Sequence, residues 1–224
     1  MRHDARAAVL GGLRRSLART NSGADAARQA VSERLTNPQP GIIPARADLD
    51  LPGRIALFTS QAEAVQTSVQ RLRGYAQVPA AIVDYLRAKN LPMRLVMAAD
   101  PLLDRADWPA MLEIRRGRAE DADAIGLTTA FAGIAETGTL MLLSDRAHPT
   151  TLAFLPETSI IALPANRVLR AYEDGLRLLR QEQGVLPRSI NFVTGPSRSG
   201  DIEQTIQLGA HGPKRLLVLL VEAG

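Results

Sequence analysis

Short apolar runs of about five residues recur along the chain, and they constrain its fold more than any other feature. Residues 124–129, 139–143 and 216–221 are nearly continuous apolar stretches. A strand that is exposed on one face alternates polar and apolar residues, so continuous runs indicate strands covered on both faces. Segments with helical spacing separate several of these runs. This alternation predicts an α/β fold, with a mostly parallel sheet and helices on both faces.

The spacing of apolar and turn residues assigns the remaining elements. We expect further strands at 54–58, 75–78, 94–98, 112–114, 152–155, 159–163 and 189–193. We expect helices over residues 60–72 and 80–89, from Pro164 or Asn166 up to Gly184, and over 202–208.

The N-terminal part of the chain differs from the rest. Residues 4–19 have a helical apolar stripe, residues 24–35 have the composition of a second helix, and the segment Asn37-Pro38-Gln39-Pro40-Gly41 marks a linker. We therefore expect a helical arm and linker at 1–45 and one α/β domain at 46–224.

Composition excludes several classes of function. The chain has no cysteine, so it can hold no disulfide, thiol nucleophile or cysteine-ligated iron–sulfur cluster, and His3, His148 and His211 have no metal-ligand spacing. We expect no metal and no cofactor in this chain.

The basic charge of the chain does not indicate nucleic-acid binding. Its pI of about 10.1 comes from arginine, but the sequence contains no basic run of the kind that binds nucleic acid. The absence of a long apolar run and of an apolar leader predicts a cytoplasmic protein without a membrane span.

The first candidate site is the turn between two of the apolar runs. Glu136 is followed by Thr137 and Gly138 in the segment 133–140. A tight turn of this kind lets a backbone approach a bound group closely and presents a side chain at a sheet edge. Glu136 could act there as a nucleophile or base. The alternative is a glutamate in water, or one that caps a short helix at 130–135.

The second candidate site follows the strand predicted at 189–193. Residues Gly195, Ser197, Arg198, Ser199 and Asp201 lie in a loop that we expect to open a helix. Backbone N–H groups at a helix N-terminus, together with hydroxyls and a guanidinium, favour a phosphate or carboxylate. The alternative is a rigid turn in which Asp201 caps the helix.

The third candidate is His211, which lies between glycines in Gly209-Ala210-His211-Gly212-Pro213. It could act as a general acid or base, or it could fix the loop through a backbone hydrogen bond. Loops at the carboxyl ends of parallel strands share one edge, so we expect Glu136 and Arg198 to meet there. Whether His211 joins them is open at this stage.

The three segments 134–139, 195–203 and 209–213, taken in this order and spacing, resemble the LUD-domain, lactate-utilization protein C family. The resemblance is dense over residues 124–221 and looser over 50–123. It implies a fold of the NagB/RpiA/CoA-transferase type. Ser199-Gly200 departs from the Thr-Ala that is more frequent in the family.

The resemblance also implies a role in oxidising L-lactate to pyruvate together with partner proteins that carry iron–sulfur clusters. In that role Glu136, Thr137, Gly138 and the residues of the 195–201 loop would bind a small carboxylate or phosphate-bearing ligand, with Arg198 as the counter-charge. Two alternatives remain open: an autonomous acyl or CoA-type transferase or a sugar-phosphate isomerase-like enzyme that uses Glu136, and a regulatory or scaffold subunit.

Overall fold

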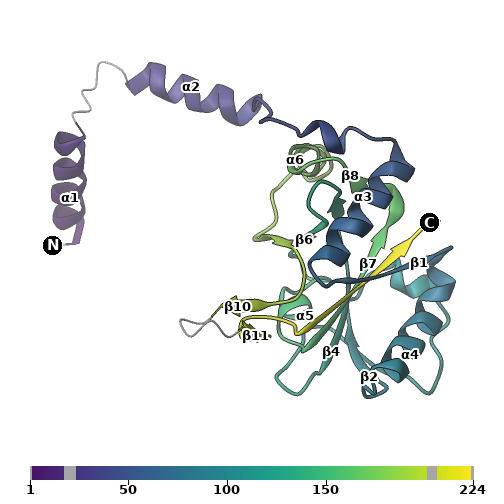
Figure 1. The fold of residues 1–224 in the computed structure, drawn as a ribbon. Coiled ribbons are helices and arrows are strands. Elements are labelled where there is room, and N and C mark those ends of the chain that lie inside the picture. The colour runs from purple at the N-terminus through teal and green to yellow at the C-terminus, as the bar shows by residue number, and fades with distance from the viewer. Residues whose placement is uncertain (1, 18–23, 201–205, 223–224) are drawn as a thin grey trace. The chain divides into compact units, whose positions relative to one another are not determined.

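The computed structural model describes residues 2–17, 24–200 and 206–222 and divides the chain into two units, 1–42 and 43–224 (Figure 1). The first unit contains helices α1 (Arg2–Ser16) and α2 (Ala24–Thr36), which confirms the predicted helical arm. In the part of the chain that the structure describes, no helix is both long and apolar enough to cross a membrane.

The larger unit is built on a six-stranded sheet in which every neighbouring pair of strands is parallel. The strand order is β1-β12-β7-β4-β2-β3. The strands are β1 (Ser68–Leu72), β2 (Arg94–Met97), β3 (Glu113–Arg116), β4 (Ile125–Thr129), β7 (Thr158–Pro164) and β12 (Arg215–Val221). The predicted α/β class with a mostly parallel sheet is therefore confirmed.

The continuous apolar runs are explained by cover on both faces of this sheet. In β12, Leu217 and Leu219 face a core that includes α4 (Val78–Ala88), whereas Leu216 and Val218 face a core that includes α3 (Leu51–Ala64). Each of these side chains is at most 2% exposed. Full burial of such a side chain is worth about 1.5–3 kcal/mol, so both faces contribute to stability.

A second, four-stranded sheet lies on the α3 side, because its strand β6 contributes Leu140 and Leu142 to that core. Its order is β8-β5-β6-β9, with β5 (Ala132–Ile134), β6 (Thr139–Leu143), β8 (Val168–Leu169) and β9 (Ile190–Val193). Helix α6 (Tyr172–Glu182) packs on this sheet through a small core that includes Leu179 and Met141. The unit is completed by the hairpin β10 (Arg198–Gly200) and β11 (Ile206–Leu208), helix α5 (Thr151–Phe154), and 3-10 turns η2 (Ala45–Ala47), η3 (Tyr75–Gln77), η4 (Leu103–Arg105) and η5 (Ala165–Arg167).

Several predicted elements are confirmed. These are the helix at 80–89 and the strands at 94–98, 112–114, 124–129, 139–143, 159–163, 189–193 and 216–221, each within a few residues. β3 forms an edge of the main sheet.

The start of the domain was predicted wrongly. Residues 54–58 belong to helix α3, which begins after Asp50, whose side chain accepts a hydrogen bond from the Gly53 amide at 2.9 Å. Their apolar run reflects a helix face with buried Ile55 and Phe58 rather than a strand. The predicted helix at 60–72 is correct only as far as Ala64. Gln66 then adopts a φ of +67°, which ends the helix, and β1 follows.

Four other predicted elements differ from the structure, two of them because of strand pairing that the local pattern cannot reveal. Residues 75–77 form a 3-10 turn and 151–154 a helix rather than strands, and α6 begins only at Tyr172 because β8 pairs with β5. The predicted helix at 202–208 is contradicted at 206–208, which pair with 198–200 as a strand. Residues 201–205, Asp201 among them, lie outside the described residues.

Candidate functional site

The Glu136 turn joins β5 to β6 and packs directly on helix α3. Gly138 has a φ of +65°, and a Cβ at this position would lie 2.3 Å from the backbone nitrogen of Ala62. Only glycine fits both the left-handed backbone and the close approach of the helix. The sequence Thr137-Gly138 therefore fixes the turn against α3.

The carboxylate of Glu136 is buried, with 7% of the residue exposed. Its Oε1 accepts a hydrogen bond of 3.2 Å from the amide of Tyr172, the first residue of α6, and its own amide donates to the carbonyl of Arg170 at 3.1 Å. Its carbonyl accepts a hydrogen bond from the Arg46 guanidinium at 3.3 Å. The interpretation of a glutamate in water or of a cap on a helix at 130–135 is wrong, because 132–134 form β5 and Glu136 caps α6 instead.

A cluster of four hydroxyl groups surrounds this turn. Thr139 Oγ1 lies 2.7 Å from Thr137 Oγ1, 3.0 Å from Tyr172 Oη and 2.6 Å from Thr194 Oγ1. Thr194 directly precedes the second candidate loop. The first two segments of the resemblance are therefore neighbours in space.

The second and third segments are also in contact. The amide of Ser197 donates to the carbonyl of Pro213 at 2.9 Å, and the amide of His211 donates to Ser197 Oγ at 3.3 Å. Gly195 lies against Val65, whose carbonyl oxygen would be 2.7 Å from a Cβ at the glycine. The loop therefore lies beside the residues that precede β1 and β12, at the amino edge of the main sheet.

This position differs from the predicted one at the carboxyl edge. The reason is that β9, which leads into the loop, is antiparallel to β6 in the smaller sheet and has no place in the parallel sheet. Arg198 lies exposed on β10, and among the described residues no hydrogen bond or ion pair joins it to Glu136. Ligand-binding roles for Thr137, Gly138, Gly195, Ser197, Arg198 and Ser199, and catalytic roles for Glu136 and His211, stay predictions.

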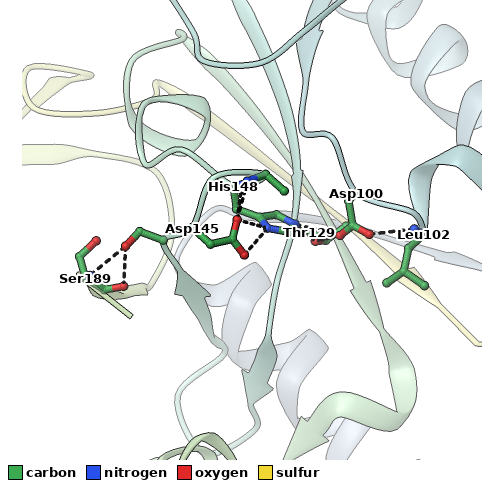
Figure 2. Close-up of polar contacts among 8 residues, drawn as sticks. Asp100, Leu102, Thr129, Asp145, His148 and Ser189 are labelled. Carbon is green, nitrogen blue, oxygen red and sulfur yellow. Dashed lines mark hydrogen bonds and ion pairs between the residues drawn. The ribbon is translucent and has the colours of Figure 1, made fainter. Parts of the chain in front are cut away.

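A polar cluster that the sequence did not reveal lies at the carboxyl edge (Figure 2). His148 Nε2 is 2.9 Å from Asp100 Oδ2, and His148 Nδ1 is 2.9 Å from Asp145 Oδ1. Thr129 Oγ1 donates to Asp100 Oδ2 and lies 3.1 Å from His148 Nε2. The amide of Leu102 donates to Asp100 Oδ1 at 2.8 Å. The imidazole of His148 is thus held between two carboxylates.

The charges of this cluster follow from these contacts. The hydrogen bond to Asp100 raises the pKa of His148 above 6.5; burial opposes the increase, and Asp145 adds to it. Burial would raise the pKa of Asp100, but hydrogen bonds from His148, Thr129 and Leu102 outweigh it and leave this pKa below 3.8. Both shifts favour the charged forms of the pair, an imidazolium beside a carboxylate.

The topology explains why polar residues collect there. From β2 the chain passes outward to β3 and then returns to β4 on the other side of β2. Ligand crevices in open parallel sheets form at such a reversal, outside the carboxyl ends of the strands. Asp100 follows β2 and Thr129 ends β4, which is a signal that sequence reasoning could have used. His148 comes from the loop after β6, and no local signal links it to Asp100.

A cavity of about 240 Å³ opens beside this cluster. Its lining includes Thr129, Phe131, Asp145, His148, Arg167 and Gln183. The Arg167 guanidinium lies 5.4 Å from the ring centroid of Phe131, and its Nη1 contacts both carboxylate oxygens of Glu182 at 2.9 Å. Among the described residues, no group of three or more His, Asp or Glu side chains is placed to hold a metal ion.

The fold and these sites define an α/β protein with a parallel sheet, a smaller mixed sheet packed on one face, and a polar crevice at the carboxyl edge. The sequence model of the LUD domain matches residues 55–221, and the chain belongs to that family.

Curated relatives support this assignment, and one solved structure shares the fold. The chain is 34% identical over 97 residues to "Lactate utilization protein C" of Anoxybacillus flavithermus, covering 43% of each chain. It is 37% identical over 108 residues to the protein of the same name from Halalkalibacterium halodurans, covering 47% of this chain and 46% of the relative. The chain spans about half the length of the curated relatives that it matches. The crystal structure of a duf162 family protein from Deinococcus radiodurans shows the same fold, with a TM-score of 0.58 at 20% sequence identity. The match covers 77% of this chain and 99% of the Deinococcus chain.

Proposed function

We propose that this chain acts in lactate utilization, as a subunit of a complex that oxidises L-lactate to pyruvate. The observation that carries the proposal is the LUD-domain match over residues 55–221, together with relatives named lactate utilization protein C. The domain supplies a polar crevice of a size suited to a small acid. Its role in the complex is to bind a small anionic ligand.

Oxidation of lactate releases two electrons and two protons, and the electrons need a carrier. This chain has no cysteine, so its residues do not fit an iron–sulfur cluster held by thiolates. We assign such clusters to partner proteins and derive no step through them in this chain. The chain's own residues would bind and orient the acid.

The proposal is tested by purifying the tagged full-length chain from cells grown on lactate, with and without its copurifying proteins. We expect lactate-dependent reduction of an artificial electron acceptor only in the preparation that contains iron and acid-labile sulfide. The chain purified alone should be inactive. Turnover by the chain alone, or full turnover by the partners without it, would contradict the proposal.

The two alternatives make different demands on Glu136. A transferase or isomerase needs this carboxylate accessible, whereas the side chain is buried and accepts a hydrogen bond from the start of α6. This contact favours a positioning role and a ligand site elsewhere. A scaffold subunit would bind its partners but no small acid, so ligand binding separates it from the leading proposal.

A further inference from the structure

We infer that the cavity at the carboxyl edge of the six-stranded sheet is the ligand site of this chain, and that it takes a small 2-hydroxy carboxylate. The chemical class of the ligand rests on the proposed function. The location rests on the geometry of the cavity, which belongs to none of the three segments that carry the family resemblance. Four steps lead to it.

The first step is size. The cavity has a volume of about 240 Å³. Sites for drug-sized ligands occupy roughly 300–1,000 Å³, so this cavity suits a metabolite of a few carbon atoms. A nucleotide or an acyl-CoA would extend far beyond it.

The second step is a fixed cation. Arg167 is in turn η5, directly after the carboxyl end of β7, and it lines the cavity. Nη1 donates hydrogen bonds to the Glu182 carboxylate, and the Phe131 ring lies beside the guanidinium. These two contacts fix the plane of the guanidinium. Nε and Nη2 of Arg167 make no hydrogen bond to any of the described residues. Two parallel N–H groups of this kind match a carboxylate in a bidentate pair.

The third step is a wall of hydrogen-bond acceptors. Asp145 and Thr129 line the same cavity as Arg167. Asp145 Oδ1 already accepts from the amides of Ala147 and His148 at 2.7 Å, which holds the carboxylate in one orientation. Among the described residues its Oδ2 contacts only the His148 ring, at 3.0 Å, so it retains capacity for another donor.

This wall discriminates between two oxidation states of the ligand. The hydroxyl of a 2-hydroxy acid can donate a hydrogen bond to the Asp145 carboxylate or to Thr129 Oγ1. The carbonyl oxygen of a 2-oxo acid has no proton to share. It would face the Asp145 carboxylate as a second acceptor, which is unfavourable. We therefore expect L-lactate to bind more tightly than pyruvate.

The fourth step is the placement of the competing sites. Glu136 is buried and does not line the 240 Å³ cavity. Arg198 lies exposed on the β10–β11 hairpin near His211, at the opposite edge of the main sheet. Carboxylate binding at an exposed guanidinium is weakened, because water competes for it.

The chain offers its own reporters for a test, because it contains three histidines in three different places. His148 lines the cavity, His211 contacts the Ser197 loop, and His3 is in the N-terminal arm. Long-range proton–nitrogen NMR of the imidazole rings can follow each histidine separately. The signals are assigned with the variants His148→Gln and His211→Gln. The full chain is then titrated with L-lactate, with pyruvate and, as an anion control, with chloride.

We expect saturable shifts of the His148 ring with L-lactate, weaker binding of pyruvate, and no saturable shift of the His211 ring. Arg167→Gln should weaken L-lactate binding at least tenfold. The matched controls Arg180→Gln, exposed on α6, and Arg198→Gln should leave the affinity unchanged. Thr129→Val should also weaken binding, and it provides a second variant should Arg167→Gln fail to fold.

Shifts confined to His211, with binding lost in Arg198→Gln, would overturn this location while leaving ligand binding by the chain intact. Equal affinity for pyruvate would overturn the preference for a hydroxyl group. If no histidine ring shifts saturably but the copurified complex still oxidises lactate, the cavity is not the lactate site and the role in the complex survives. If the complex is inactive as well, the proposed function fails together with this inference.

Discussion

The hydroxyl groups of Thr139 and Thr194 lie 2.6 Å apart, although 55 residues separate them in the chain. Tyr172 completes the connection, since its hydroxyl lies 3.0 Å from Thr139 and 3.1 Å from Thr137. This contact joins the turn between β5 and β6 to the loop after β9. Hydroxyl groups thus link the first segment of the family resemblance to the residue that directly precedes the second. The Glu136 carboxylate in the same turn accepts a hydrogen bond from the first residue of α6.

Tyr172→Phe should lower the free energy of unfolding by about 1–2 kcal/mol, because it leaves two threonine hydroxyls with fewer partners. The ring should stay in place, since it packs edge-to-face on Phe192 at a centroid distance of 5.1 Å. Urea unfolding followed by circular dichroism measures the change. Tyr85→Phe is the control, because the Tyr85 hydroxyl has no hydrogen-bond partner among the described residues. An equal loss in both variants would contradict a structural role for the hydroxyl cluster.

Substitutions at Glu136 separate a positioning role from a covalent one. Glu136→Gln keeps an oxygen that accepts from the Tyr172 amide, so we expect the unfolding free energy to change by less than about 0.5 kcal/mol and complex activity to persist. Glu136→Ala removes the acceptor and should cost about 1–2 kcal/mol. Lactate-dependent dye reduction by the complex and urea unfolding measure both effects. If Glu136→Gln folds normally and abolishes turnover, the carboxylate has a chemical role and the transferase or base reading gains support.

Gly138→Ala should be strongly destabilising, by about 2–4 kcal/mol. The residue has a φ of +65°, and the new Cβ would lie 2.3 Å from the backbone nitrogen of Ala62 in α3. Gly184→Ala is the matched control, because nothing lies within 4 Å of a Cβ at that position. Thermal unfolding of the two variants should differ clearly. A mild effect at Gly138 would show that α3 can move away from the turn.

The contribution of His148 to stability should depend on pH in a defined direction. Because the folded state raises its pKa above 6.5, the stabilisation is fully present below pH 6.5 and is lost as pH rises through the folded-state pKa. The folded state lowers the pKa of Asp100 below 3.8, so that contribution is present above pH 3.8 and is lost as pH falls through the folded-state value. The window of greatest stabilisation is therefore pH 3.8–6.5.

His148→Gln should thus be less stable than the unmodified chain at about pH 5, and the gap should narrow towards about pH 9. Urea unfolding across this range measures the difference. His211→Gln serves as the control, since the ring of His211 has no hydrogen-bond partner among the described residues. A gap that is constant with pH would show that the loss comes from packing rather than from the His148–Asp100 ion pair.

The local sequence pattern predicted correctly the short strands that are buried on both faces. The apolar runs at 124–129, 159–163 and 216–221 form adjacent central strands, because a continuous run has few options other than a strand with both faces covered. The same reasoning failed at 54–58, where a helix face and a buried strand have similar residues. The Asp50 cap and Pro52 were the signals that would have decided it.

The sequence by itself determined the parallel α/β class, the helical arm, the lack of thiol chemistry and the family, because these depend on composition, periodicity and the order of short segments. Only the tertiary structure decided which polar residues meet. It placed β9 antiparallel to β6 in a separate mixed sheet, which carried the Ser197 loop to the amino edge, and it turned Glu136 towards α6. It also brought Asp100 and His148, which are 48 residues apart, into a single ion pair. Such contacts are set by strand order and sheet pairing, which are long-range properties that no local pattern contains.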